Sequence, residues 1–233
     1  MVTEVLKKIL SEDLDYQKQP KVQGKNKDRE GLIHDLIIKR KSDNTEVLND
    51  LWILNEEFVH FDGCSELEIK QIKSSSGQKL LREISDEEIQ KFGIKHNKRP
   101  DIFLFPEEGK CVLIELKEPL TDMSDHLQQL PKYCQLIANY SINPINQFYC
   151  YLVGEKINPL MDLNEYEENV TGDWVKSDIP IRSIDANRTK IATAQMEVIK
   201  LSSLHSRAHR RNQSFAEKLG LPELLNSENK KKK

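Results

Sequence analysis

Two apolar runs joined by a short turn restrict most strongly how this sequence can fold. Residues 99–105 read Arg-Pro-Asp-Ile-Phe-Leu-Phe, and residues 111–117 read Cys-Val-Leu-Ile-Glu-Leu-Lys. Between them, Pro106 and Gly109 are residues that favour tight turns. Apolar runs of this length on both sides of a turn are typical of paired strands, so the two runs are predicted to form an antiparallel β-hairpin.

The turn also predicts which residues of the hairpin lie opposite each other. A tight turn at 107–108 pairs residues whose numbers add up to about 216, which places Asp101 opposite Glu115. Because side chains alternate along a strand, Glu115 and Lys117 share one face and Ile114 lies on the other. We therefore predict that Asp101, Glu115 and Lys117 converge, with about 5 Å between the β-carbons of the two acidic residues.

Two carboxylates and an ammonium group at one point suit a hard divalent cation. Mg²⁺, or Mn²⁺ in its place, binds carboxylate oxygens and keeps several water molecules. A neighbouring lysine can orient one such water for in-line attack on a phosphate, whose developing charge the cation stabilises. Glycosidases also use paired carboxylates, but Lys117 has no evident role in that chemistry. A surface hairpin with purely structural charges is the alternative interpretation.

The composition predicts a protein without membrane contact. Of the 233 residues, 37% are hydrophobic and 31% charged, and the longest apolar run, 148–153, is too short to cross a bilayer. The first 16 residues lack a signal-peptide core, and the four cysteines are widely spaced without a CxxC pair. We expect a cytoplasmic protein with reduced thiols. Because the net charge is −3, any nucleic-acid contact must come from local basic patches.

Three parts are predicted along the chain. Residues 1–28 form an amphipathic helix and a polar linker, residues 29–222 form the main α/β domain, and residues 223–233 form a disordered basic tail. The first helix is expected to pack on the main domain. The alternatives are a contact between copies of the chain in a homo-oligomer, or the tail of an upstream module.

A third carboxylate for the cation is expected from the segments that precede the hairpin. An apolar stripe in 29–40 predicts a helix that carries Glu30 in its first turn. Residues 49–62 are rich in aromatic and β-branched side chains, which predicts a buried strand or a pair of strands. That segment offers Glu56 or Glu57 as the alternative to Glu30.

The segments around and after the hairpin alternate between helix and strand. Ser85 and Glu88 form a capping-box pattern that predicts a short helix. Residues 121–140 predict a helix that starts late because of Pro131, and residues 147–153 predict a strong strand. Residues 156–174 are acidic and turn-rich, which indicates a surface excursion or lid. A late strand at 195–201 and a basic helix at 204–219, closed by Gly220, end the predicted fold.

Basic side chains that could contact a nucleic-acid backbone occur in two clusters. One directly precedes Asp101, and the other lies on the terminal helix; a solvated charged face is the alternative for each. The candidates are Lys95, Lys98, Arg99, Arg207, Arg210 and Arg211.

Several of these features resemble the PD-(D/E)xK nuclease superfamily. Its signature is matched by Pro100-Asp101, thirteen intervening residues and Glu115-Leu116-Lys117. The order of helix, strand, hairpin, helix and strand is similar to the restriction-endonuclease-like αβββαβ core, a mixed central sheet flanked by helices. The sequence further resembles one bacterial branch of this superfamily, which is often found C-terminal to ATPase modules of the Hsp90/histidine-kinase type and in anti-phage defence. This resemblance covers residues 51–56, 114–119 and 148–151, Gln129 with Tyr133, and residues 208–221.

The resemblance implies a Mg²⁺-dependent endonuclease that cuts DNA and leaves 5′-phosphates. Asp101, Glu115 and Glu30 would hold the metal, Lys117 would position or activate the water, and Gln129 would steady the water or the lysine. An ATPase partner is implied on another segment or chain, because this sequence has no GxxxxGK[ST] run.

The sequence also departs from that branch at two places. Asn55-Glu56-Glu57 stands where the branch usually has Asp-Glu-Arg, and Glu118 stands where it has Arg. The extra negative charge of Glu118 would weaken the approach of a phosphate or help bind a second metal. The alternatives to a DNA nuclease are therefore a catalytically silent nucleic-acid-binding or assembly module of the same fold, and an effector that cuts RNA.

Overall fold

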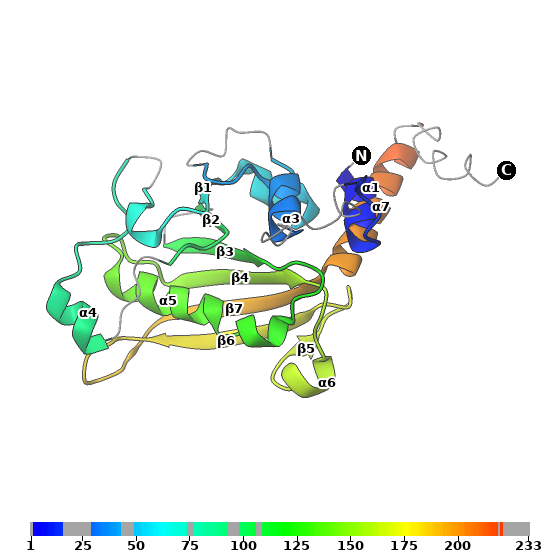
Figure 1. Ribbon diagram of the computed structural model, residues 1–233. Helices are drawn as coiled ribbons and strands as arrows, with labels where there is room; N and C mark the ends of the chain where they lie inside the picture. The colour runs from blue at the N-terminus through cyan, green and yellow to red at the C-terminus, as the bar shows by residue number, and fades with distance from the viewer. Residues whose placement is uncertain are drawn as a thin grey trace, which may run out of the picture.

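The computed structural model describes residues 2–15, 29–42, 49–73, 77–92, 98–105, 109–218 and 220. Within these residues, seven strands form one mixed sheet in the order β1-β2-β3-β4-β7-β6-β5 (Figure 1). The strands β3, β4 and β7 are parallel to one another, and the pairs on either side of them are antiparallel. The strands are β1 (Asp62–Ser65), β2 (Ile102–Phe105), β3 (Lys110–Leu116), β4 (Gln147–Gly154), β5 (Glu167–Glu168), β6 (Trp174–Arg182) and β7 (Lys190–Lys200).

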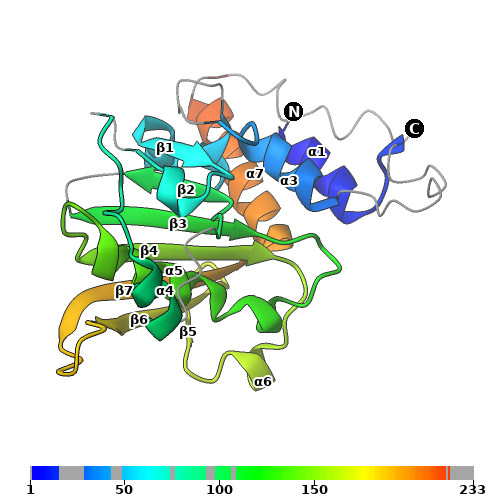
Figure 2. The same cartoon turned by 60° about the vertical axis from the view of Figure 1, so that its left-hand side comes forward.

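Helices cover both faces of the sheet, as Figure 2 shows from a second side. The coarse prediction of an α/β protein with a mixed sheet flanked by helices is therefore confirmed, while the PD-(D/E)xK identity of its core stays a prediction. The α-helices are α1 (Val2–Leu10), α3 (Arg29–Ile37), α4 (Asp86–Phe92), α5 (Gln129–Tyr140), α6 (Pro159–Asp162) and α7 (Leu201–Lys218). Short 3₁₀ helices are η1 (Leu51–Ile53), η2 (Glu56–His60), η3 (Ile69–Gln71) and η4 (Met123–His126).

The predicted hairpin is present with the predicted register. In the pairing of β2 with β3, Ile102 lies opposite Ile114 and Phe103 opposite Leu113. Gly109 has the positive φ of 76° that a turn residue needs, while residues 106–108 of the turn lie outside the described residues.

The register is held because both faces of the hairpin are buried. Phe103 and Leu113 pack toward α5, and Ile102 and Ile114 pack in a second cluster with Ile33 of α3. A slip by one residue would exchange the two sets of side chains between the faces. Burying one such side chain stabilises the fold by about 1.5–3 kcal/mol, so the two-sided core strongly favours one register.

Most predicted helices are confirmed. Ser85 and Glu88 form the predicted capping box, because each backbone N–H donates to the other side chain. Helix α5 starts late, at Gln129, and Pro131 occupies its first turn. Helix α7 ends before Gly220, whose φ of 65° is positive, as expected at a C-cap.

The N-terminal helix packs on the rest of the chain, as predicted. Leu6 and Ile9 of α1 are buried, and α1 contacts both α7 and α3. No helix in the described parts of the chain has the length and apolar character needed to cross a membrane. The predicted linker 17–28 and basic tail 223–233 lie outside the described residues.

The prediction of a strand or strand pair at 49–62 is wrong for most of that segment. Residues 51–53 form η1 and residues 56–60 form η2, and only Asp62 already belongs to β1. The side chain of Asn55 accepts a hydrogen bond from Glu57 N–H and so caps η2. Leu51, Ile53 and Phe58 are buried from these short helices, which satisfies the aromatic and β-branched side chains without an extended backbone.

The sequence did not predict β6, and β7 begins at Lys190 instead of residue 195. Strand β6 is irregular, because its pairing with β7 shifts between Lys176 and Ile179 and Asp178 has a positive φ of 56°. The predicted acidic excursion at 156–174 contains α6 and β5 and turns back into β6.

Candidate functional site

The three predicted side chains come together at one end of the hairpin. Asp101 directly precedes β2, and its Oδ2 accepts a hydrogen bond of 2.7 Å from the Leu116 N–H on β3. Glu115 lies near the end of β3, and the Lys117 N–H that follows donates to Val153 O on β4. One hydrogen bond to the Asp101 carboxylate and one between backbones therefore connect Asp101, the end of β3 and the end of β4.

Lys117 lies between two carboxylates. Its Nζ donates to Glu115 Oε1 at 2.9 Å and lies 3.7 Å from Glu30 Oε2. Glu30 comes from the first turn of α3, which is the position expected for the third carboxylate. The alternatives, Glu56 and Glu57, are exposed on η2. The structure thus brings Glu30 to the site.

Helix α5 adds an amide and a hydroxyl group. Gln129 Nε2 donates to Glu115 Oε1 at 2.5 Å and to Tyr133 Oη at 3.0 Å. The Tyr133 hydroxyl in turn donates to Arg99 O at 3.0 Å. Gln129 therefore points at the site, and its contact there is with Glu115, while its predicted role of steadying the water or Lys117 stays a prediction.

His126 belongs to this network but was not predicted. Its Nδ1 lies 3.2 Å from Gln129 Oε1. The signal in the sequence was the spacing of three residues between His126 and Gln129, just before the late start of the helix. That signal is weak, because the same spacing occurs in any helical surface.

Burial sets the electrostatics of the site. It raises the pKa of Asp101 to about 8, and the nearby Glu115 charge adds to this effect. Burial likewise raises the pKa of Glu115, although Lys117 and Gln129 oppose it. For Lys117, burial lowers the pKa, but the surrounding carboxylates outweigh burial and raise it. The neighbouring groups of the protein therefore do not fully compensate the negative charge of the ionised carboxylates at the site.

The residues present fit a divalent cation of the Mg²⁺ type. Glu115 Oε2 is a buried oxygen without a hydrogen-bond partner, and Asp101 provides a second carboxylate nearby. Among the described residues, no three His, Cys, Asp or Glu side chains are arranged to enclose a metal ion. Mg²⁺ does not need such a cage, because it commonly uses one or two carboxylates and completes its shell with water and phosphate oxygens.

Two of the predicted basic residues, Lys98 and Arg99, contact Tyr133 of the site, Lys98 through its side chain and Arg99 through its backbone. Lys98 Nζ lies 5.9 Å from the centre of the Tyr133 ring, and the neighbouring Arg99 is exposed. The carbonyl oxygen of Arg99 accepts a hydrogen bond from the Tyr133 hydroxyl group. Both lie in the segment that leads into Asp101.

The basic residues of the terminal helix lie elsewhere. Arg207 Nη1 lies 2.9 Å from Oδ2 of the fully buried Asp173, in an ion pair without hydrogen-bond alignment. That ion pair disfavours a role for Arg207 in binding nucleic acid. Arg210 is exposed on α7, while the Arg211 side chain and Lys95 lie outside the described residues. Their predicted contacts with nucleic acid stay predictions.

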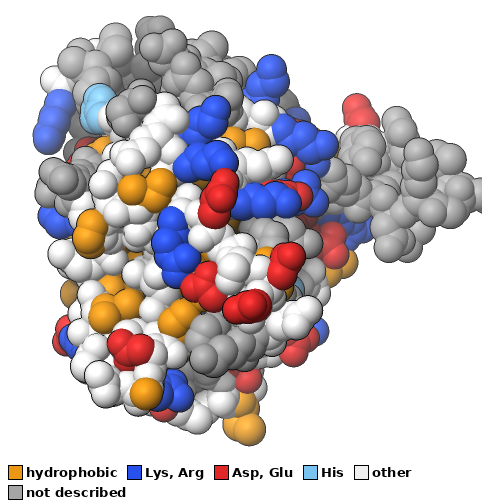
Figure 3. All heavy atoms as spheres, turned by 90° about the vertical axis from the view of Figure 1, so that its left-hand side faces the viewer, with side chains coloured by type: hydrophobic (Ala, Val, Ile, Leu, Met, Phe, Trp, Pro, Cys, Tyr) orange, Lys and Arg blue, Asp and Glu red, His pale blue; other side chains and the backbone are white. Residues whose placement is uncertain are grey.

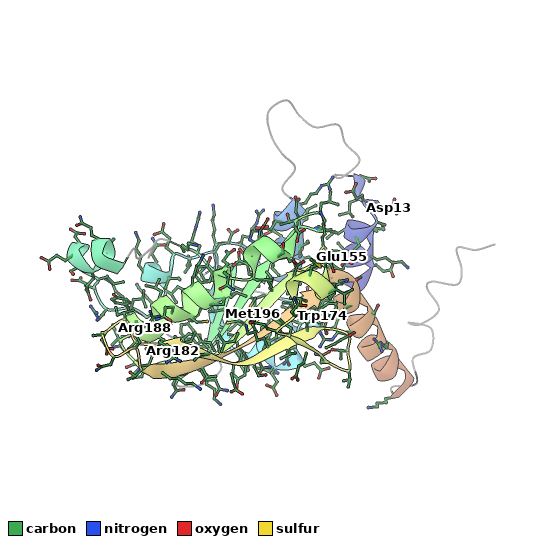
Figure 4. The ribbon with its side chains drawn as sticks, turned by 90° about the horizontal axis from the view of Figure 1, so that it is seen from below. Asp13, Glu155, Trp174, Arg182, Arg188 and Met196 are labelled. Carbon is green, nitrogen blue, oxygen red and sulfur yellow. The ribbon has the colours of Figure 1, made fainter. Side chains whose placement is uncertain are left out.

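The far end of the sheet carries mixed charges. Figure 3 shows Lys and Arg side chains intermixed with Asp and Glu on the end of the molecule near α4 and the β6–β7 hairpin. Arg182 and Arg188 lie there, at the opposite end of the sheet from Glu155, which follows β4 (Figure 4). Because Lys117 is joined to Val153 near the end of β4, the mixed surface does not adjoin the site.

Met123 anchors η4 against the end of β4. Met123 is fully buried, and its N–H donates to Lys156 O. A β-carbon on Gly154 would lie 2.6 Å from Met123 Sδ and 2.8 Å from its Cγ. Glycine at this position is therefore what allows η4, and His126 with it, to lie against the sheet.

Gly154→Ala is expected to destabilise the protein by about 1–3 kcal/mol, which is typical of overpacking. Thermal unfolding measures this loss. Adding Met123→Ala to the same chain should cost less than the sum of the two single substitutions, because the smaller side chain makes room for the new methyl group. Strictly additive losses would contradict the contact between these two residues.

Comparisons of the chain with models of known protein families, with curated proteins and with solved structures found no match.

Proposed function

We propose that this chain is a metal-dependent endonuclease that hydrolyses phosphodiester bonds of DNA. The observation that carries the proposal is the convergence of Asp101, Glu115 and Lys117 at one end of the sheet, with Glu115 Oε2 buried and unpaired. An unpaired buried carboxylate oxygen is costly for the fold unless a ligand compensates it. A hydrated cation is the ligand that this set of side chains suits best.

Each side chain has a distinct role in the proposed reaction. Asp101 and Glu115, with Glu30 beyond the lysine, would hold Mg²⁺ or Mn²⁺. When bound, such an ion supplies positive charge to the phosphate and makes nearby water more acidic. Lys117 would then orient the water that attacks phosphorus, and Gln129 would keep Glu115 in place.

The wider setting follows from the resemblance to the PD-(D/E)xK superfamily. It supports an effector of anti-phage defence in the cytoplasm, working with an ATPase module or partner protein. Lys98, near the Tyr133 ring, and the exposed Arg99 next to it support contact with a nucleic-acid backbone.

One observation favours a catalytically silent module instead. The Lys117 ammonium is already within 2.9 Å of Glu115 and 3.7 Å of Glu30, so a cation is partly replaced by the protein's own charge. In that case the protein would bind nucleic acid or assemble with a partner without cutting.

Cleavage of supercoiled plasmid DNA distinguishes the two. The protein is expected to nick or linearise the plasmid in Mg²⁺ or Mn²⁺ and to leave it intact in EDTA. The Glu167→Gln variant, which changes an exposed carboxylate on β5, should cut equally well. Intact plasmid under every metal condition would exclude the DNA nuclease, and parallel assays with single-stranded DNA and RNA would show which nucleic acid is cut.

A further inference from the structure

The partners of Gln129 determine which of its amide atoms donates and which accepts. The Tyr133 hydroxyl donates its single hydrogen to Arg99 O, so its oxygen must accept from Gln129. The atom of Gln129 that faces Tyr133 and Glu115 is therefore the amide nitrogen. Its oxygen must then face His126, and the pair is satisfied only if His126 Nδ1 carries a hydrogen.

His126 is held rigidly enough to impose this arrangement. Asp122 caps η4, because its Oδ1 accepts hydrogen bonds from the backbone N–H and the hydroxyl group of Ser124. Met123 fastens the same turn to the end of β4 through its buried side chain and its N–H. The imidazole ring therefore projects from an anchored turn, not from a loose loop.

We propose that His126 is a positioning residue of this site. By donating from Nδ1 to Gln129 Oε1, it holds the amide of Gln129 from its oxygen side and so keeps Gln129 Nε2 against Glu115. The consequence for DNA cleavage rests on the proposed nuclease function, whereas the state of the imidazole does not.

Loss of this donor should disturb Glu115 through Gln129. Without His126, Tyr133 and Glu115 still require the amide nitrogen, because both accept from it, but Gln129 Oε1 loses the partner that restrains it on its other side. The amide can then move away from Glu115 more easily. Where it does so, Glu115 keeps Lys117 as its remaining hydrogen-bond partner among the described residues.

The first test is spectroscopic and does not depend on activity. Long-range ¹H–¹⁵N correlation spectra of the full chain report which imidazole nitrogen of His126 carries hydrogen. We expect hydrogen on Nδ1 at every pH, including pH values at which the ring is neutral. A neutral ring protonated only on Nε2 would overturn the proposal, even if the protein proved to have no nuclease activity.

The second test measures cleavage rates. His126→Ala should lower kcat by roughly ten- to a hundredfold, as is typical when a side chain that supports a metal ligand is removed. His126→Asn should recover most of this loss, because its amide N–H can take the place of Nδ1–H. Asp125→Asn, an exposed neighbour on the same turn, serves as the matched control.

A double-mutant cycle with Gln129→Ala completes the design. If His126 acts through Gln129, the double variant should cut no more slowly than Gln129→Ala alone. Multiplicative losses, or failure of His126→Asn to cut faster than His126→Ala while thermal unfolding shows both to be folded, would overturn the proposal. If the unsubstituted protein does not cut DNA, the nuclease function fails and the spectra alone decide the role of His126.

Discussion

Lys117→Gln is expected to slow DNA cleavage by about 10²–10⁴-fold, the range typical for a side chain that transfers or directs a proton in the transition state. Glutamine keeps a donor that can reach Glu115 but removes the positive charge. Mg²⁺ binding should not weaken, and it should become somewhat tighter, because Glu115 and Glu30 lose the ammonium that now partly neutralises them. Cleavage assays and isothermal titration with Mg²⁺ measure the two effects separately.

The separation of binding from cleavage is what makes this prediction specific. Lys190→Gln, on the exposed start of β7, removes the same charge away from the site and should leave both quantities unchanged. Lys117 is largely buried, so thermal unfolding must show that its variant is folded at the assay temperature. Cleavage within a few-fold of the unsubstituted rate would remove Lys117 from the mechanism.

The core of the site could be predicted because few physical rules determine it. A short turn and strict alternation fix the register of a hairpin, and the register places Asp101, Glu115 and Lys117 together. Gln129 was predicted as a site residue from the resemblance to the PD-(D/E)xK superfamily, and it lies in the first turn of α5. The features of the hairpin depend on local sequence alone, so they could be predicted without knowledge of the rest of the fold.

Other parts depend on contacts that the local pattern does not reveal. The apolar residues of 51–60 suit a strand, but the Asn55 cap and burial against distant elements favour 3₁₀ helices. The role of Arg207 was obscured because its partner Asp173 lies on another segment. His126 was overlooked because its significance comes from the hydrogen-bond direction set by Tyr133 and Arg99.

Asp101→Asn is expected to flatten the pH dependence of stability. An aspartate has a pKa near 3.8 when unfolded, whereas in this fold the pKa of Asp101 is raised to about 8. The folded state therefore binds more protons than the unfolded state between these values, so stability falls as pH rises from about 4 to about 8. Asparagine has no charge to lose and can still accept from the Leu116 N–H.

The variant should consequently be more stable than the unsubstituted protein at pH 8 in EDTA and nearly equal to it at pH 4. At pH 8 the difference in the free energy of unfolding is expected to be on the order of a few kcal/mol, a value that already includes a reduction by the coupling to Glu115. For a chain of this size it corresponds to about 5–10 °C in Tm. Thermal unfolding between pH 4 and pH 9 measures it, with Glu167→Gln as the control.

Mg²⁺ should reverse the order of stability. A cation that binds the folded state between Asp101 and Glu115 favours the ionised carboxylates, so it should raise the Tm of the unsubstituted protein most strongly near pH 8. Asp101→Asn lacks one of the two ligands and should show little or no rise. It should also lose DNA cleavage despite its greater stability in EDTA. A pH profile and Mg²⁺ response that match those of the unsubstituted protein would mean that Asp101 neither carries the strained charge nor binds the metal.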